Sequence, residues 1–338
     1  MMTQINQIKE ITLGALRVYE KDGYVCFSRF SEKQEQDLWD YGCGTKIFGT
    51  SNIRLEFWTK GGEISFDYEI TPGTVREYYS VDLKVDGVYR YGVCKNTNKD
   101  KDTFAFAVPL SEELKRVTVY FPATACLKLK NLSLPKDFKP HNRTLKILTL
   151  GDSLVQGYHP NHFCNTYMNI VADELYANII NQAVGGDCFR RENVYIADGF
   201  EPDFITVAYG INDWASYRLG NGEEAHAYLE ALTTLYPDKR IFFTLPLDNK
   251  YIEENIKNED IIKQDIAENK KRVSTLEEVR QILANVAKDF PTVTCINAKD
   301  FVPCWEDCYF ADKVHFTDLG NVFYAIGYTK EIKKYIEV

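Results

Sequence analysis

The hydrophobic pattern of the sequence changes near residue 140, and this change constrains the fold more than any other feature. Before it, short runs of alternating apolar and polar residues recur, and they are rich in β-branched and aromatic side chains. These runs lie at residues 53–58, 63–68, 79–85, 103–108, 117–121 and 127–130. Because period-two alternation is typical of half-buried antiparallel strands, we predict an all-β sandwich or jelly-roll domain over residues 1–140. Tight hairpins are expected at Gly61-Gly62 and Asp86-Gly87.

After residue 141, apolar runs alternate with segments of helical spacing. The apolar runs lie at residues 145–150, 179–184, 204–209, 240–245 and 292–296, and the helical segments at residues 166–176, 223–235 and 274–288. Near-continuous apolar strands that alternate with helices indicate a parallel sheet covered on both faces. We therefore predict a three-layer α/β domain over residues 141–338, with the charged run at 249–272 as a solvated helix or loop.

Two stretches have a weaker pattern. Residues 135–142 contain two prolines among polar residues, which makes them the best candidate for a linker between the domains. The segment up to residue 49 is expected to be irregular, with one or two strands of the β domain.

The charge balance argues against a polyanionic partner. The 338-residue chain has 40 Lys and Arg residues against 49 Asp and Glu residues, a net charge of −9. No basic field would attract nucleic acid or an anionic membrane. The first residues lack the pattern of a signal peptide, and the nine cysteines are odd in number and scattered, which favours reduced thiols over a disulfide framework. We expect a cytoplasmic protein, or one whose export signal is missing from this sequence, with neither nucleic acid nor membrane as partner.

Four short polar motifs stand where a ligand site of such a sheet would be. GDSL (151–154) follows the first strand of the second half, GGD (185–187) the second and GIND (210–213) the third, while DKVH (312–315) lies beyond the fifth. Ligands of open α/β sheets bind at the carboxyl ends of the strands. We therefore expect all four motifs at one end of the sheet.

Together and in this order, the motifs resemble the four sequence blocks of the SGNH hydrolases, also called the GDSL esterase and lipase family. The resemblance covers roughly residues 145–328. It implies a flavodoxin-like catalytic domain in which Ser153 is the nucleophile and Asp312 and His315 complete a catalytic triad.

The same resemblance implies three donors to an oxyanion, which are the backbone N–H of Ser153, the backbone N–H of Gly186 and the side-chain amide of Asn212. The second motif departs from the family pattern, because Gly185 stands where the family usually has serine. Of the two adjacent glycines we assign Gly186 as the donor.

The chemistry of these side chains supports the same assignment. A serine hydroxyl attacks a carbonyl only with help from a base near neutral pKa, and an imidazole such as that of His315 supplies one. A carboxylate such as Asp312 fixes the tautomer of the base and stabilises the imidazolium. We therefore predict acyl transfer through an acyl-Ser153 intermediate, with no cofactor or metal, and activity that rises with pH as His315 loses its proton.

Metal binding is a weaker interpretation of the remaining motifs. His159 and His162 flank a short loop after the nucleophile, but no carboxylate or cysteine joins them at ligand spacing. Cys304 and Cys308 lie near His315 without an evident fourth ligand. A polar pocket loop and unligated thiols are the simpler interpretations.

The substrate is suggested by aromatic residues near the motifs. Tyr158, Trp214 and Trp305 are candidate pocket residues, with ordinary core packing as the alternative for each. Aromatic faces beside a polar centre favour a sugar ring, whereas a long acyl chain would require an aliphatic tunnel. The order of a jelly roll before the hydrolase domain is also similar to carbohydrate esterase family 2, whose members remove acetyl groups from polysaccharides or oligosaccharides. We therefore expect an oligosaccharide or small-molecule ester as substrate. The alternatives are a lipase or thioesterase of the same family and a catalytically inactive carbohydrate-binding protein.

Overall fold

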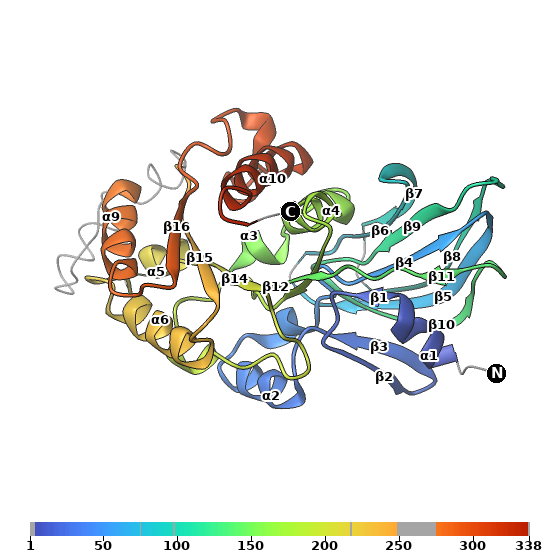
Figure 1. Cartoon of the computed structure of the whole chain (residues 1–338), viewed down its shortest axis with the longest axis horizontal. Coiled ribbons are helices and arrows are strands. Elements are labelled where there is room, and N and C mark those ends of the chain that lie inside the picture. The colour runs from blue at the N-terminus through green and yellow to red at the C-terminus, as the bar shows by residue number, and fades with distance from the viewer. Residues whose placement is uncertain (1–3, 75, 97–98, 217, 249–274, 337–338) are drawn as a thin grey trace.

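The structure is a computed structural model that describes residues 4–74, 76–96, 99–216, 218–248 and 275–336 (Figure 1). The charged run at 249–272 lies outside the described residues. A β-rich part and a helix-covered parallel sheet lie side by side in Figure 1. The predicted fold class, an α/β domain preceded by a β sandwich, is confirmed. We propose residue 140 as the boundary between the two domains.

The antiparallel strands of the β-rich part form two sheets. The first has the order β1-β4-β9-β6-β7, with β11 paired to β4, and the second has the order β2-β3-β10-β5-β8. The strands are β1 (Thr12–Leu13), β2 (Arg17–Lys21), β3 (Tyr24–Ser28), β4 (Arg54–Thr59), β5 (Gly62–Pro72), β6 (Tyr79–Val85), β7 (Val88–Lys95), β8 (Asp100–Val108), β9 (Lys115–Tyr120), β10 (Ala125–Ser133) and β11 (Lys139–Pro140).

One of the two predicted hairpins is present. The turn at Asp86-Gly87 joins β6 to β7, in which Val85 lies opposite Val88. The hairpin predicted at Gly61-Gly62 is wrong, because β4 and β5 belong to different sheets. These two glycines instead carry the chain from one sheet to the other, with φ angles of 133° and 113° that other residues rarely adopt.

The segment before residue 49 holds more regular structure than its weak pattern predicts. Besides β1 to β3 it contains the helices α1 (Gln4–Ile11) and α2 (Glu32–Asp40) and the 3-10 helix η1 (Gly44–Phe48). A capping box starts α2: Ser31 Oγ accepts the N–H of Gln34 at 3.2 Å, and Gln34 Oε1 accepts the N–H of Ser31 at 2.9 Å. Serine followed by glutamine three residues later is a known start signal, so this helix could have been predicted.

The second part is a five-stranded parallel sheet in the order β13-β12-β14-β15-β16. This is the flavodoxin-like order, in which successive strands are added first on one side of β12 and then, from β14 on, on its other side. The strands are β12 (Leu145–Gly151), β13 (Ala177–Asn181), β14 (Phe204–Ala208), β15 (Arg240–Leu245) and β16 (Val293–Asn297). The helices are α3 (Ser153–Gln156), η2 (Phe163–Asn165), α4 (Tyr167–Glu174), η3 (Arg191–Asn193), α5 (Ile211–Ala215), α6 (Glu223–Leu235), α9 (Leu276–Ala287), η4 (Glu306–Cys308) and α10 (Asp318–Ile332). Among the described residues, no helix is long and apolar enough to cross a membrane.

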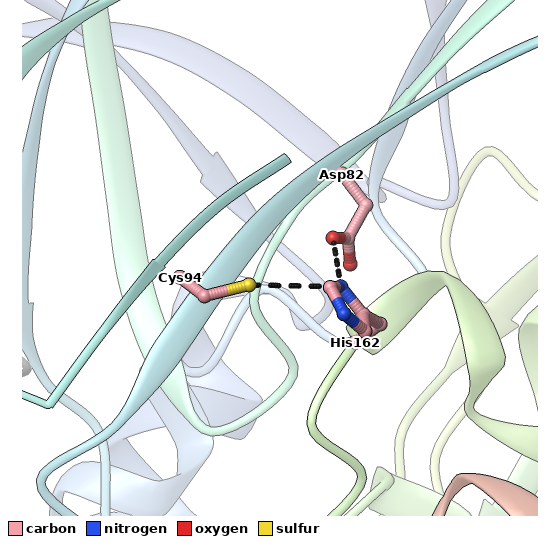
Figure 2. Close-up of side chains that lie close together, drawn as sticks. All are labelled: Asp82, Cys94 and His162. Atoms are coloured by element: carbon pink, nitrogen blue, oxygen red, sulfur yellow. Dashed lines mark hydrogen bonds and ion pairs between the residues drawn. The ribbon is translucent and has the colours of Figure 1, made fainter. Parts of the chain in front are cut away.

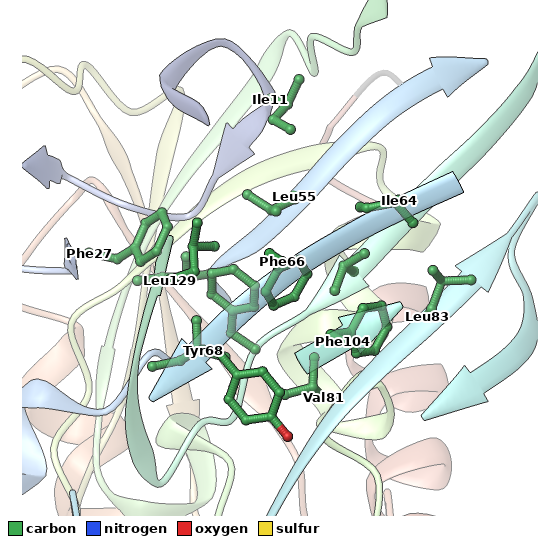
Figure 3. Packing of buried hydrophobic residues seen from close by; sticks show 14 of the residues in the cluster. Ile11, Phe27, Leu55, Ile64, Phe66, Tyr68, Val81, Leu83, Phe104 and Leu129 are labelled. Atoms are coloured by element: carbon green, nitrogen blue, oxygen red, sulfur yellow. The ribbon is translucent and has the colours of Figure 1, made fainter. Parts of the chain in front are cut away.

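Each part has its own hydrophobic core. Inside the sandwich, the side chains of both sheets interleave (Figure 3), and the rings of Phe66 and Phe104 stack with centroids 5.1 Å apart. In the parallel sheet, α6 and α9 cover one face, where Leu148 and Phe243 are buried. The helices α4 and α10 cover the opposite face, where Ile147 is buried. Apolar residues on both faces of the parallel sheet are thus buried under helices. This packing fixes the position of the strand ends near which the four motifs lie.

A buried ionic network joins the two parts. Arg143 donates to both carboxylate oxygens of Glu56, at 2.7 and 2.6 Å, and to Asp173 at 2.9 Å. Although burial alone would raise the pKa of Asp173, Arg54 and Arg143 lower it to about 2. The predicted linker at residues 135–142 is not a free tether, because its strand β11 pairs with β4.

Candidate active site

The GDSL motif at residues 151–154 forms the turn between β12 and α3. Asp152 is the N-cap of α3, and its Oδ1 accepts the N–H of Leu154 at 3.0 Å. A side chain at Gly151 would place Cβ 2.7 Å from the carbonyl oxygen of Ala208, so this tight turn requires glycine. Ser153 is the first residue of α3, where a backbone N–H has no partner within the helix. The turn therefore presents both the hydroxyl and the N–H of Ser153 at the end of the sheet.

Ser153, His315 and Asp312 form one chain of hydrogen bonds. His315 Nε2 lies 2.8 Å from Ser153 Oγ, and His315 Nδ1 lies 2.7 Å from Asp312 Oδ2. The other carboxylate oxygen, Asp312 Oδ1, accepts the backbone N–H groups of Val314 and His315 at 2.9 and 3.0 Å. Burial alone would raise the pKa of Asp312, but these bonds hold it well below its usual range. Asp312 is therefore an anion held in one orientation against the imidazole.

The residues predicted as oxyanion donors lie at the same edge. Gly186 has a φ of 79°, a left-handed conformation that glycine adopts freely. The neighbouring Gly185 N–H is occupied, because it donates to Gln156 Oε1 at 2.7 Å. Asn212 Nδ2 donates one proton to the carbonyl of Asp187 at 2.9 Å, which leaves its second proton for another acceptor.

A cleft of about 570 Å³ opens beside these groups. It is lined by Ser153, Asn212 and His315, by both glycines of the second motif, and by residues of the β-rich part: Gly42, Cys43, Gly44, Thr45, Lys46 and Thr74. Lys46 Nζ donates to the carbonyl of Gly185 at 2.5 Å and so fixes the second motif from across the cleft. Sequence reasoning missed these residues of the β-rich part, because no local pattern near them marks a site.

A model of the GDSL-like lipase/acylhydrolase family matches residues 149–322, which is just over half of the chain. The chain belongs to this family. It is therefore an ester-bond hydrolase. No curated protein sequence matches it.

Solved structures share the two-part fold of this GDSL acylhydrolase at low sequence identity. One is a salicylyl-acyltransferase from a tetracycline biosynthetic pathway, with a TM-score of 0.75, 15% identity and coverage of 96% of this chain and 94% of that one. Another is an acetyl xylan esterase from the rumen bacterium Butyrivibrio proteoclasticus, with a TM-score of 0.63, 14% identity and coverage of 98% and 97%. A third is a family two carbohydrate esterase from Clostridium thermocellum in complex with cellohexaose, with a TM-score of 0.62, 15% identity and coverage of 96% and 98%. At these identities the likeness shows the fold.

One of the three aromatic residues predicted to line the pocket of this GDSL acylhydrolase does so. Tyr158 lines the cleft, and its ring stacks on His315 with centroids 5.3 Å apart. Trp214 does not line it: this side chain is 2% exposed and packs in the core of the parallel sheet. Trp305 does not line it either, because it is 58% exposed and packs against Phe323. For these two tryptophans the prediction is wrong.

The departure from the family pattern at Gly185 has a local cause. A Cβ atom at this position would lie 2.5 Å from the hydroxyl oxygen of Tyr158. The tyrosine of this GDSL acylhydrolase therefore fills the space into which a serine side chain would project.

The two histidines of the loop after α3 lie in different environments. His159 stacks on Phe310 with ring centroids 4.1 Å apart, and its Nε2 lies 3.4 Å from Asp312 Oδ2. Burial is the main cause, and the nearby His315 the second, of a pKa of about 4 for His159. The His159 side chain is therefore neutral at neutral pH. His162 instead faces Asp82 of the β-rich part. Of the cysteines considered as metal ligands, Cys308 is buried and Cys304 is exposed.

Two buried carboxyl groups accept hydrogen bonds from backbone N–H groups of the loops around the site. Asp213 Oδ1 accepts the N–H of Phe189 at 3.0 Å, as Asp152 Oδ1 does for Leu154, so both carboxyl groups have a structural role. Burial raises the pKa of Asp152 to about 6 and that of Asp213 to about 7. Asp213 Oδ2 is buried without a hydrogen-bond partner among the described residues, which suits a protonated carboxyl.

The substitution Asp213→Asn is expected to change how stability depends on pH. A carboxyl whose pKa is raised in the folded state stabilises the fold fully below its unfolded pKa, and this contribution is lost as pH rises through about 7. The stability of the variant relative to wild type should therefore increase by about 2 kcal/mol between about pH 5 and pH 8. Melting temperatures across this range measure the effect, with exposed Asp238→Asn as control. A difference that stays constant with pH would contradict the assignment.

Proposed function

We propose that this protein is a serine esterase that removes O-acetyl groups from carbohydrates. The observation that carries the proposal is the continuous chain of hydrogen bonds from Ser153 through His315 to Asp312 at the edge of an open cleft. This is the arrangement that nucleophilic acyl transfer requires: a hydroxyl, a base within reach of its proton, and a carboxylate that orients the base.

The reaction proceeds in two halves. Ser153 Oγ attacks the ester carbonyl while its proton passes to His315 Nε2, and the oxyanion is held by the N–H of Ser153, the N–H of Gly186 and the amide of Asn212. The tetrahedral intermediate collapses, and the sugar hydroxyl leaves with the proton from His315. Water then attacks the acetyl-Ser153 ester with His315 as base, which releases acetate and restores the serine.

A small apolar pocket supports a short acyl group. It has a volume of about 60 Å³ and touches both Ser153 and His315, and its apolar walls include Ile211, Leu247 and Val314. A water needs about 10–15 Å³ measured in this way, so the pocket holds an acyl group of only a few heavy atoms. An acetyl group fits it, and the long acyl chain of a lipase substrate does not.

The cleft supports a polar alcohol group on the other side of the ester. Its lining combines Thr45, Lys46 and Thr74 with the aromatic side chain of Tyr158. Hydroxyl and ammonium groups beside one aromatic ring suit a sugar, which presents hydroxyls at its rim and C–H bonds on its faces. An esterase acting on xylan and an esterase with bound cellohexaose have the same fold, which favours this substrate class.

The acyl-length profile tests the proposal. Wild-type protein should release acetate from acetylated xylo- or manno-oligosaccharides, and its kcat/KM on nitrophenyl esters should fall at least about tenfold from acetyl to butyryl. The variants Leu247→Ala and Val314→Ala should shift this ratio toward butyryl by about tenfold, because they enlarge the acyl pocket. Ile282→Ala, on a separate surface pocket, is the matched control. A rate maximum at octanoyl would instead establish the lipase alternative.

A further inference from the structure

A second cluster of reactive side chains lies where the β-rich part meets the loop after α3 (Figure 2). Asp82 on β6 and Cys94 on β7 lie close together, and His162 faces them from residues 158–165. His162 Nδ1 lies 2.9 Å from Asp82 Oδ1 and 3.6 Å from Cys94 Sγ. A carboxylate, a thiol and an imidazole therefore converge on one point.

The carboxylate of this cluster is fixed on its far side. Asp82 is fully buried, and its Oδ2 accepts the hydroxyl of Ser80 at 2.8 Å and the N–H of Cys164 at 3.1 Å. These bonds leave Oδ1 directed at His162. Hydrogen bonds to a carboxylate from groups behind it commonly orient the ligands of protein metal sites.

The strand opposite Asp82 packs closely against it. Gly92 is the residue paired with Asp82 across β6 and β7. A Cβ atom at Gly92 would lie 2.7 Å from Asp82 Oδ1 and 2.5 Å from the hydroxyl oxygen of Tyr89. A side chain at position 92 would clash with both groups, so glycine is needed here for Asp82 Oδ1 to keep its place facing His162.

The imidazole is also held in place from its own loop. The backbone N–H of His162 donates to Asp318 Oδ1 at 3.1 Å, and the ring packs edge-on against Tyr89 with centroids 5.1 Å apart. About a third of the His162 side chain is exposed, so solvent ions can reach it. The position of Nδ1 is therefore set before any ion arrives.

We propose that Asp82, Cys94 and His162 bind a divalent transition metal ion, for which Zn²⁺ is the probe. The three ligand atoms lie within 4.8 Å of one another. With bonds of about 2.0 Å to nitrogen and 2.3 Å to sulfur, tetrahedral Zn²⁺ separates such atoms by about 3.5 Å, close to the 3.6 Å found between Nδ1 and Sγ. A thiolate with an imidazole selects zinc-like ions over Ca²⁺ or Mg²⁺, which prefer oxygen ligands. Water completes the coordination.

Bound metal would fasten the β-rich part to the loop after α3. The same loop carries His159, which contacts Asp312, and its backbone at Asn161 and His162 is bound to Asp318 at the start of α10. The ion lies outside the hydrolytic cleft, so its role is structural. It stabilises the folded state by the free energy of binding, while ester hydrolysis proceeds without a metal step.

Metal content and cobalt spectroscopy test the proposal on the full-length protein in the presence of a phosphine reductant. We expect one Zn²⁺ per chain after dialysis against Zn²⁺, a thiolate-to-metal charge-transfer band when Co²⁺ replaces it, and a higher melting temperature with Zn²⁺. The variants Cys94→Ser and His162→Gln should each lose at least about tenfold in affinity, and Cys94→Ser should lose the band. Two control variants remove an exposed thiol or an exposed histidine elsewhere, namely Cys304→Ser and His226→Gln. Both should keep the wild-type affinity for Zn²⁺ and the charge-transfer band.

Three results would overturn the proposal. The first is wild-type protein that binds no Zn²⁺ at micromolar concentration. The second is a charge-transfer band that survives in Cys94→Ser. The third is that Zn²⁺ binds Cys94→Ser as tightly as wild type and inhibits hydrolysis. Such an ion would instead occupy another group of possible ligands in the described structure, formed by His159, Asp312 and His315. Circular dichroism confirms that each variant is folded before its metal content is compared.

Discussion

The substitution Ser153→Ala is expected to lower kcat for acetyl-ester hydrolysis by at least about 10⁴-fold. Without Oγ there is no acceptor for the acyl group, and the proton that His315 would remove is absent. The oxyanion donors remain in place, because the backbone N–H of residue 153, Gly186 and Asn212 are untouched. The residual rate should therefore still exceed the uncatalysed rate.

Two further measurements test the assignment of Ser153 as the nucleophile. Rapid quenching of the wild-type reaction, followed by intact-mass spectrometry, should detect protein heavier by one acetyl group, and the variant should show none. Ser133→Ala, which changes an exposed serine of β10, should keep the wild-type rate and melting temperature. An unchanged rate in Ser153→Ala would refute the nucleophile assignment. Wild-type protein inactive on every ester would support the alternative of a carbohydrate-binding protein without catalysis.

The part of the site that the sequence predicted is the part that parallel-sheet geometry brings together. Ser153 and Asn212 each follow a strand, and neighbouring parallel strands end at the same edge of the sheet. The hydrophobic pattern that predicts the strands therefore also predicts that these residues meet. Asp312 and His315 need a further assumption, that the chain returns to this edge after β16, and the family resemblance provided it.

The predictions that failed depended on the direction in which a side chain or a strand points. Trp214 is two residues from Asn212 on α5, and two positions on a helix point about 200° apart. Placing Asn212 at the cleft therefore turns the tryptophan into the core. Gly61-Gly62 failed for a related reason, because a turn signal does not say whether the strands on either side pair with each other or belong to opposite sheets of a sandwich.

Contacts between the two parts were beyond the reach of the sequence. Lys46 and Thr74 reach the cleft only because the sandwich packs against the sheet edge, and this packing depends on buried groups such as Arg143 and Glu56. The proposed metal ligands show the same limit. No carboxylate or cysteine stands at ligand spacing from His162 in the sequence, whereas Asp82 lies 80 positions away and meets it through the same packing.

The substitution Asp312→Asn is expected to lower kcat by about 10³–10⁴-fold while leaving the fold intact. Because Asp312 Oδ1 accepts two backbone N–H groups, an asparagine would place its carbonyl oxygen there and turn its NH₂ toward His315 Nδ1. Nδ1 would then have to accept a hydrogen bond, which puts the ring proton on Nε2. In that tautomer His315 cannot take the proton of Ser153, so the base is lost although every atom is nearly in place.

The measurement is kcat and KM on an acetyl ester, with the exposed Asp300→Asn as the matched control. The loss should fall on kcat with KM changed little, since Asp312 is absent from the cleft lining. A loss confined to KM would indicate that Asp312 binds substrate. A loss of less than about tenfold in kcat would instead give the orienting role to His159, a polar side chain that lies beside both His315 and Asp312.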